Sequence, residues 1–104
     1  MDRRVIFAPT SIRDLADSVS YISRFDPNAA ARLGDSLIEA AERMLGKHPL
    51  AGPVCPEYPE GPYRYWLHKG YRIVYQISET EDQVEILRFW HCAQGDVPLS
   101  TNQS

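Results

Sequence analysis

Proline is concentrated in one stretch of this chain, and that stretch limits what the chain can fold into. Five of the eight prolines fall within residues 49–62. Proline fixes its own φ, lacks a backbone N–H and disfavours helix in the residue before it, so the stretch is neither a helix nor a central strand. We expect an extended connection on the surface. It divides the chain into a first part with helical periodicity and a second part with the two-residue period of strands.

The part before the connection predicts a strand followed by a helix. Residues 4–8 are rich in β-branched and aromatic side chains and end at Pro9, which is typical of a strand. Thr10 or Ser11 then begins a helix, and Asp14 follows Ser11 by three residues, as in a capping box.

A second helix is predicted to begin at Asp26 and Pro27 and to run to about Leu45, so the two helices form an antiparallel hairpin. Gly34 lies inside this helix, where glycine lowers helix stability by about 1 kcal/mol relative to alanine. We attribute the presence of a glycine here to close approach of the first helix. The hairpin carries a wide apolar stripe that includes Leu15, Val19, Ile22, Leu33 and Leu37. One sheet either covers only part of this stripe and leaves a groove for a partner, or buries it completely.

The part after the connection predicts three strands, over residues 63–68, 71–77 and 84–91. A two-residue loop of Lys69 and Gly70 pairs His68 with Tyr71, whereas a loop that also includes His68 pairs Leu67 with Tyr71. The three-residue loop places glycine at the left-handed position of a G1 bulge and separates two sets of side chains cleanly. We therefore predict the three-residue loop and its register.

This register places Arg64, Trp66 and Arg72 on one face of the sheet, beside His68, with His91 at the end of the neighbouring strand. Residues 61–78 contain basic side chains and no carboxylate. Arginine binds phosphate and carboxylate groups in bidentate geometry, so this face is a candidate binding surface for either. The alternative is a solvated face on which arginine stems cover Trp66.

His91 and Cys92 are adjacent at the end of the last strand. A histidine there can act as a general acid or base, or it can be structural. Neighbouring strand residues point to opposite faces, so we do not expect the two side chains to form a nucleophilic pair. The histidines have no metal-ligand spacing, and no glycine-rich phosphate loop or dinucleotide fingerprint is present, so we expect neither a metal nor a cofactor.

Size and charge narrow the class of protein further. The 104 residues fit a single α+β domain, with a flexible tail over residues 97–104. A net charge of −3 argues against binding nucleic acid by general phosphate neutralisation. Two cysteines make no disulfide framework, and no apolar run suits a signal peptide or a membrane span. We therefore expect reduced thiols, a cytoplasmic location and no membrane contact.

The order of these elements resembles the ParE/RelE superfamily of toxins from bacterial type II toxin–antitoxin systems. The resemblance covers residues 4–96 and implies a β-α-α-β-β-β fold, with a helical hairpin packed on a mainly antiparallel sheet. It is carried by Asp14-Leu15-Ala16, Asp26-Pro27-Asn28-Ala29-Ala30, Leu37-Ile38-Glu39-Ala40-Ala41, His48-Pro49-Leu50-Ala51-Gly52, Gly70-Tyr71-Arg72-Ile73-Val74-Tyr75 and Val84-Glu85-Ile86-Leu87-Arg88-Phe89-Trp90-His91. The turn at residues 26–30 and the ending at residues 91–96 are most similar to the ParE branch.

The resemblance implies a toxin that a cognate antitoxin holds inactive, in a toxin–antitoxin complex of higher order. A ParD-like antitoxin with a ribbon-helix-helix domain is expected to pack a helix on the hairpin. The predicted contact residues are Leu15, Val19, Ile22, Leu33 and Leu37.

The two branches of the superfamily act on different targets, so the resemblance implies two alternatives for this chain. ParE-like members inhibit DNA gyrase and are not nucleases, whereas RelE-like members cleave messenger RNA on the ribosome. The leading hypothesis is a gyrase inhibitor that has no catalytic residue and contacts its target through Arg64, Trp66, Arg72 and His91. In the endoribonuclease alternative, Arg72 stabilises phosphate charge and His91 is the general acid/base, without a metal. A third alternative is a degenerate member that has kept only antitoxin binding.

Overall fold

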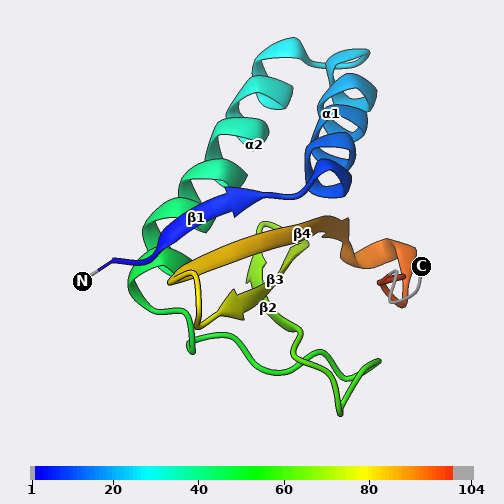
Figure 1. The fold of residues 1–104 in the computed structure, drawn as a ribbon. Helices are drawn as coiled ribbons and strands as arrows, with labels where there is room; N and C mark the ends of the chain where they lie inside the picture. The colour runs from blue at the N-terminus through cyan, green and yellow to red at the C-terminus, as the bar shows by residue number, and fades with distance from the viewer. Residues whose placement is uncertain (1, 100–104) are drawn as a thin grey trace.

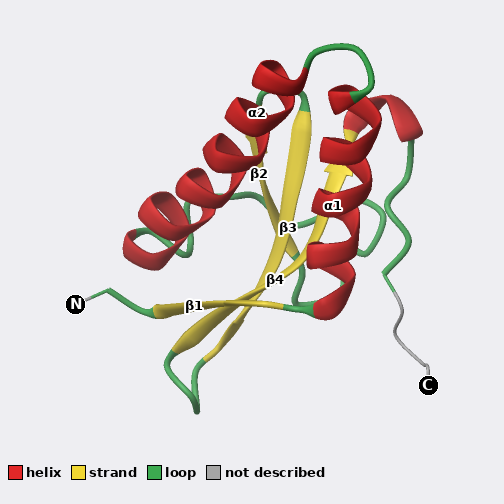
Figure 2. Ribbon diagram, turned by 90° about the horizontal axis from the view of Figure 1, so that it is seen from above, coloured by secondary structure: helices red, strands yellow, loops and turns green. Residues whose placement is uncertain are grey.

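Two helices cover one face of a four-stranded sheet in the computed structural model, which describes residues 2–99 (Figure 1). The elements in chain order are β1 (Arg4–Phe7), α1 (Pro9–Ser23), α2 (Pro27–Ala40), β2 (Arg64–His68), β3 (Tyr71–Ser78) and β4 (Gln83–His91). Figure 2 shows α1 and α2 side by side over the sheet. The α+β architecture and the order of elements predicted from the sequence are confirmed.

The strands are arranged in the order β1-β4-β3-β2, and β1 runs parallel to β4 while the other pairs are antiparallel. β1 is short and its pairing ends where Phe7 lies opposite Ile86. The start of α1 then continues along the same edge of β4, because Ala8 N donates to Ile86 O (2.8 Å) and Thr10 Oγ1 donates to Leu87 O (2.7 Å). On this edge the last residues of β4 therefore lie next to α1 instead of next to β1, while β3 pairs with their other edge.

Both helices begin with a proline in the first turn, but only α2 has the side-chain cap that we predicted. Asp26 accepts a hydrogen bond from Ala29 N at 3.1 Å. The predicted capping box of α1 is wrong: its N-cap is Ala8, and Ser11 Oγ donates to the Ala8 carbonyl. Asp14 is thereby free to contact β4.

The helices approach closely at Gly34, as predicted. A Cβ atom at this position would lie 3.2 Å from Val19 Cγ2, which is tighter than ordinary van der Waals contact. Beyond this contact α2 continues into a π-helical turn, Ala41–Leu45, so the helical part ends close to the predicted Leu45.

The predicted register of the β2–β3 hairpin is wrong. His68 pairs with Tyr71, and Lys69 and Gly70 form a two-residue turn with φ values of 52° and 82°. Two consecutive residues with positive φ define the type I′ turn, which matches the twist of the flanking strands. Arg64 and Trp66 consequently share a face with Tyr75 and Ile73, whereas Arg72 faces the other way.

The sheet is covered on both faces. The main core lies between the helices and the sheet and includes Leu37, Leu45, Ile73, Tyr75, Ile86 and Phe89. On the opposite face, which we call the far face, a second cluster is formed by Cys55, Val74, Val97 and Leu99. Its members come from the proline-rich connection, from β3 and from the C-terminal end.

The C-terminal segment, residues 95–99, packs against this far face. Val97 and Leu99 are buried, so the prediction of a flexible tail from residue 97 is wrong for residues 97–99. The rest of the predicted tail, residues 100–104, lies outside the described residues. None of the helices in the described part of the chain is both long and apolar enough to cross a membrane.

Candidate functional site

The binding surface predicted from the sequence is divided between the two faces of the sheet. Arg64 Nη1 donates to the Gly52 carbonyl at the edge of β2, and Trp66 packs against the main core. Both side chains are half-buried on the side of the helices. They do not form one surface with Arg72.

Arg72 lies on the far face and is paired inside the molecule. Its guanidinium forms a bidentate ion pair with Glu57, with Nη1 to Oε2 at 2.8 Å and Nη2 to Oε1 at 2.9 Å. The two side chains are only 14% and 10% exposed, and the guanidinium stacks over the Tyr65 ring at 4.8 Å. The positive charge of Arg72 is therefore neutralised by a neighbour and largely withdrawn from solvent.

His91 is exposed and lies on the face that carries the helices. It pairs across the sheet with Tyr71, and the two rings meet edge to face at 4.9 Å. His91 Nδ1 accepts a weak hydrogen bond from Ala93 N at 3.3 Å. Because Arg72 pairs with Trp90, one position along each strand, Arg72 and His91 point to opposite faces of the sheet.

Most of the residues predicted to contact an antitoxin instead pack inside the protein, within the helical hairpin or against the sheet. Leu37 is fully buried, and Leu15 and Leu33 pack against the main core. Val19 faces Gly34 between the two helices. Ile22 differs from these four because it lines an open groove.

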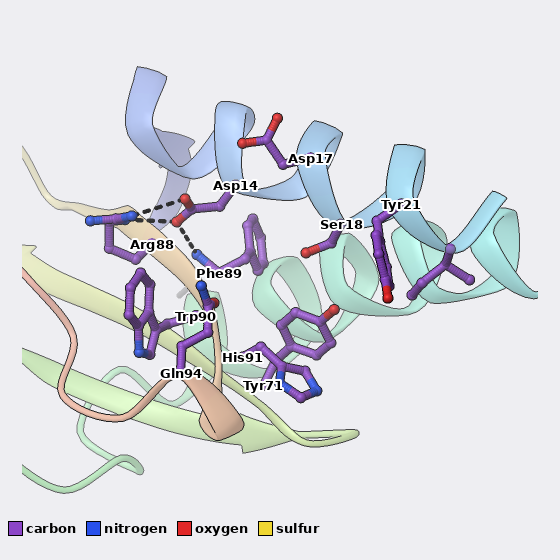
Figure 3. Close-up of a pocket in the computed structure, with 11 residues that line it drawn as sticks. Asp14, Asp17, Ser18, Tyr21, Tyr71, Arg88, Phe89, Trp90, His91 and Gln94 are labelled. Atoms are coloured by element: carbon purple, nitrogen blue, oxygen red, sulfur yellow. Dashed lines mark hydrogen bonds and ion pairs between the residues drawn. The ribbon is translucent and has the colours of Figure 1, made fainter. Parts of the chain in front are cut away.

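This groove runs between α1 and the end of β4 and has a volume of about 650 Å³ (Figure 3). We call it the α1–β4 groove. Its wall is contributed by Asp14, Asp17, Ser18, Tyr21 and Ile22 from α1 and by Tyr71, Arg88, Phe89, Trp90, His91 and Gln94 from the sheet and its end. Aromatic rings with polar edges and a few carboxylate, hydroxyl and amide groups make it suited to a peptide segment that is partly apolar.

An ion pair that the sequence did not reveal forms one end of the groove. Arg88 Nε and Nη2 donate to the Asp14 carboxylate at 2.7 and 3.0 Å, and Phe89 N donates to the same carboxylate at 3.1 Å (Figure 3). The partners are 74 residues apart, and no local pattern signals such a contact. The contact of Glu57 with Arg72 has no local signal either, because the two residues are 15 positions apart and Glu57 lies in the irregular connection.

Comparison with known proteins now identifies the family. The sequence matches the family model of the ParE toxin of type II toxin-antitoxin system, parDE, over residues 5–95. The chain belongs to the ParE toxin family. No curated protein is similar enough in sequence to count as a relative.

Solved structures of similar fold come from toxin–antitoxin systems. The chain is similar to the toxin-antitoxin complex RelBE2 from Mycobacterium tuberculosis, with a TM-score of 0.64 and 25% identity, over 88% of this chain and 99% of that chain. It is also similar to the chromosomal ParDE system from P. aeruginosa, with a TM-score of 0.70 and 16% identity, over 86% and 95% of the two chains. The second likeness concerns the fold alone.

The two thiols of this ParE-family toxin lie in different surroundings. Burial raises the pKa of the Cys55 thiol from 9.0 to about 11, so this cysteine is protonated near neutral pH. Cys92 is exposed at the end of β4. Within residues 2–99 there is no group of three or more His, Cys, Asp or Glu side chains that could hold a metal ion.

Proposed function

We propose that this ParE-family toxin inhibits DNA gyrase by binding to it, and that a cognate antitoxin neutralises it. The observation that carries the choice of target is the separation of Arg72 and His91 on opposite faces of the sheet. An endoribonuclease needs its phosphate-stabilising cation and its general acid/base around one reacting phosphate. These two side chains cannot serve one phosphate in this arrangement, which favours a binding inhibitor over a nuclease.

Charge supports the same proposal. Arg72 is paired with Glu57, and the chain carries a net charge of −3, and both observations disfavour binding of ribosomal RNA by general phosphate neutralisation. A protein target does not require such neutralisation. Of the four residues predicted to contact the target, His91 is the exposed one, and its substitution tests target contact most directly.

For the antitoxin we propose the α1–β4 groove, at Ile22 and the residues around it, as the docking site. RelBE2, to which this chain is similar over 88% of its length, is a toxin–antitoxin complex. Large aromatic side chains extend the groove toward the tip of the hairpin, where Tyr21 and Phe25 are 61% and 72% exposed and contact each other. Exposed aromatic residues beside a groove are typical of surfaces that bind an amphipathic helix. The partner we propose is therefore a ParD-like antitoxin that supplies such a helix.

The target is tested with the purified toxin in a gyrase supercoiling assay, in parallel with a ribosome-dependent assay of messenger RNA cleavage. We expect inhibition of supercoiling that is relieved by the antitoxin, and we expect filamentation with a DNA-damage response when the toxin is expressed in a bacterial host. Rapid translation arrest with cleaved messages would instead identify the endoribonuclease. The absence of any growth defect would identify a degenerate member that has kept only antitoxin binding.

The docking site is tested with two substitutions on the same helix. Ile22→Arg places a charge in the groove and is expected to weaken antitoxin binding at least about tenfold, since a buried unpaired charge is costly. Ile12→Arg is the matched control, because Ile12 is 51% exposed on α1 and is not among the residues that line the groove. Equal affinities of the two variants would rule out the groove as the docking site.

A further inference from the structure

The C-terminal segment, residues 95–99, is fastened to the connection by specific hydrogen bonds. Val97 N donates to Glu57 Oε2 at 3.0 Å. The Tyr58 hydroxyl donates to Val97 O at 3.1 Å and accepts from Leu99 N at 3.0 Å. With Val97 only 1% exposed, the segment is held in one defined position on the far face.

Arg88 connects this segment to the α1–β4 groove. Its Nη1 donates to the Pro98 carbonyl at 2.8 Å, while Nε and Nη2 bind the Asp14 carboxylate. The guanidinium also lies over the Trp90 ring, 4.9 Å from its centre. Because the guanidinium is planar and rigid, the contact with Pro98 fixes the direction in which the other two donors point.

Asp14 in turn joins α1 to the edge of β4, since it accepts the hydrogen bond from Phe89 N. The carboxylate is thereby drawn to the strand, at the end of the groove that Figure 3 shows. Among the described residues that line the groove, none comes from the C-terminal segment. The segment reaches the groove through two residues that line it: Arg88, which donates to the Pro98 carbonyl, and Trp90, whose Nε1 donates to the Gly95 carbonyl at 2.8 Å. Of these two, Arg88 also binds the Asp14 carboxylate.

We propose that the C-terminal segment is a positioning element of the α1–β4 groove: by holding Arg88 it keeps Asp14 on the edge of β4 and fixes α1 at the spacing that binds the partner. Docking of the segment and binding in the groove are then positively coupled, and each strengthens the other by the same factor. The part that concerns the partner rests on the proposed function. The coupling between the segment and Asp14 does not.

The coupling is tested on the chain alone by amide hydrogen exchange, read at Phe89 N–H relative to the core amide of Ile73. Val97→Asp places a charge in the far-face cluster and drives the segment off, and Tyr58→Phe loosens it by removing the hydroxyl. Both are expected to speed exchange at Phe89 by about fivefold or more, with Val97→Asp the stronger. Tyr63→Phe is the matched control, since it removes the hydroxyl of the neighbouring ring in the same cluster.

Unchanged relative exchange at Phe89 in Val97→Asp would overturn the coupling, as would an equal change in Tyr63→Phe. In an Asp14→Asn background, which removes the charged acceptor, Val97→Asp should have no further effect on Phe89. A further effect of the same size would show that the influence does not pass through Asp14 and would also overturn the proposal.

The effect on the partner is measured as the affinity of wild type and Val97→Asp for the purified antitoxin. We expect Val97→Asp to bind at least about fivefold more weakly, although Val97 does not line the groove. Equal affinity together with faster exchange at Phe89 would overturn the part that concerns the partner. If wild type does not bind the antitoxin, the proposed function fails, and the exchange measurement still decides the coupling.

Discussion

Arg72 and His91 lie in adjacent strands and near each other in the register, yet their side chains point to opposite faces of the sheet. Arg72 is closed in by Glu57 and the connection on the far face, whereas His91 is exposed beside the α1–β4 groove. The positions of the two residues in the sequence would allow a shared site, but the alternation of side chains along the strands excludes it. A binding inhibitor and an acid–base nuclease should therefore differ in how much toxicity depends on His91 alone.

Substitution of His91 by alanine tests that difference. Removal of a general acid or base lowers a rate by about 10²–10⁴-fold. An exposed side chain in a binding surface contributes much less, so we expect the growth inhibition by His91→Ala, at matched expression, to fall by less than about tenfold. Complete loss of toxicity, with antitoxin binding intact and with the neighbouring Gln94→Ala still toxic, would support the nuclease instead.

Among the ion pairs of the described residues, the one between Glu57 and Arg72 is the most buried, and we expect its loss to lower the free energy of unfolding most. Glu57→Gln leaves the guanidinium buried without its counter-charge and weakens the bond to Val97 N. Removal of one partner of a buried pair costs about 3–5 kcal/mol, and we expect about 3 kcal/mol here because both side chains retain slight exposure. Urea unfolding measures this against Glu60→Gln, an exposed carboxylate in the same connection. Similar stabilities of the two variants would contradict the role of Glu57.

The turn between β2 and β3 provides a test of the observed register. In a type I′ turn both central residues have positive φ, which lysine adopts at a cost and asparagine more readily. Lys69→Asn is therefore expected to raise the free energy of unfolding by about 0.5 kcal/mol, and Gly70→Ala to lower it by about 1 kcal/mol. In the three-residue loop Lys69 has negative φ. That loop would be supported if Lys69→Asn left the free energy of unfolding unchanged while Gly70→Ala lowered it.

The features that could be predicted from the sequence are those that depend on neighbouring residues. Asp26 and Pro27 mark the start of α2 by themselves, and Gly34 marks the close approach of two helices that a short turn forces together. The proline-rich connection likewise separates the helical part from the strands without any tertiary contact. The order of elements followed from these local signals.

The register of β2 and β3 could not be obtained in this way, because apolar residues cover both faces of the sheet. A one-residue slip is excluded by pattern only where one face is solvated, and here Val74 is as completely buried on the far face as Ile73 is on the other. That burial depends on Val97 and Leu99, whose position is set by contacts with Glu57 and Tyr58 about 40 residues earlier. The groove end at Asp14 and Arg88 is a similar long-range contact.

The close approach at Gly34 predicts a non-additive pair of substitutions. Gly34→Ala improves helix propensity by about 1 kcal/mol, but its Cβ would lie 3.2 Å from Val19 Cγ2. In a Val19→Ala background this clash is absent, so Gly34→Ala should stabilise the chain by about 1 kcal/mol more than Val19→Ala alone. In wild type the gain should be smaller or reversed. Thermal unfolding of the four chains measures the coupling, and strict additivity would contradict the observed helix contact.

Alkaline pH is expected to destabilise the protein through Cys55. Burial raises the pKa of this thiol to about 11, above its ordinary value of 9.0, so the folded state holds the proton more tightly than the unfolded chain. The resulting stabilisation is complete below about pH 9 and is lost as the pH rises toward 11. Burial also raises the pKa of Tyr75, which adds a loss in the same direction.

Melting temperatures between pH 7 and pH 10.5 measure this effect, because Cys55→Ala removes the first group and leaves the second. The variant should start about 1 kcal/mol less stable and should then lose less stability than wild type above pH 9. Cys92→Ala, which removes the exposed thiol, should follow the wild-type curve. If Cys55→Ala declined as steeply as wild type over this range, the alkaline loss would have to come from Tyr75 and other groups, and the protonated buried thiol would not contribute to it.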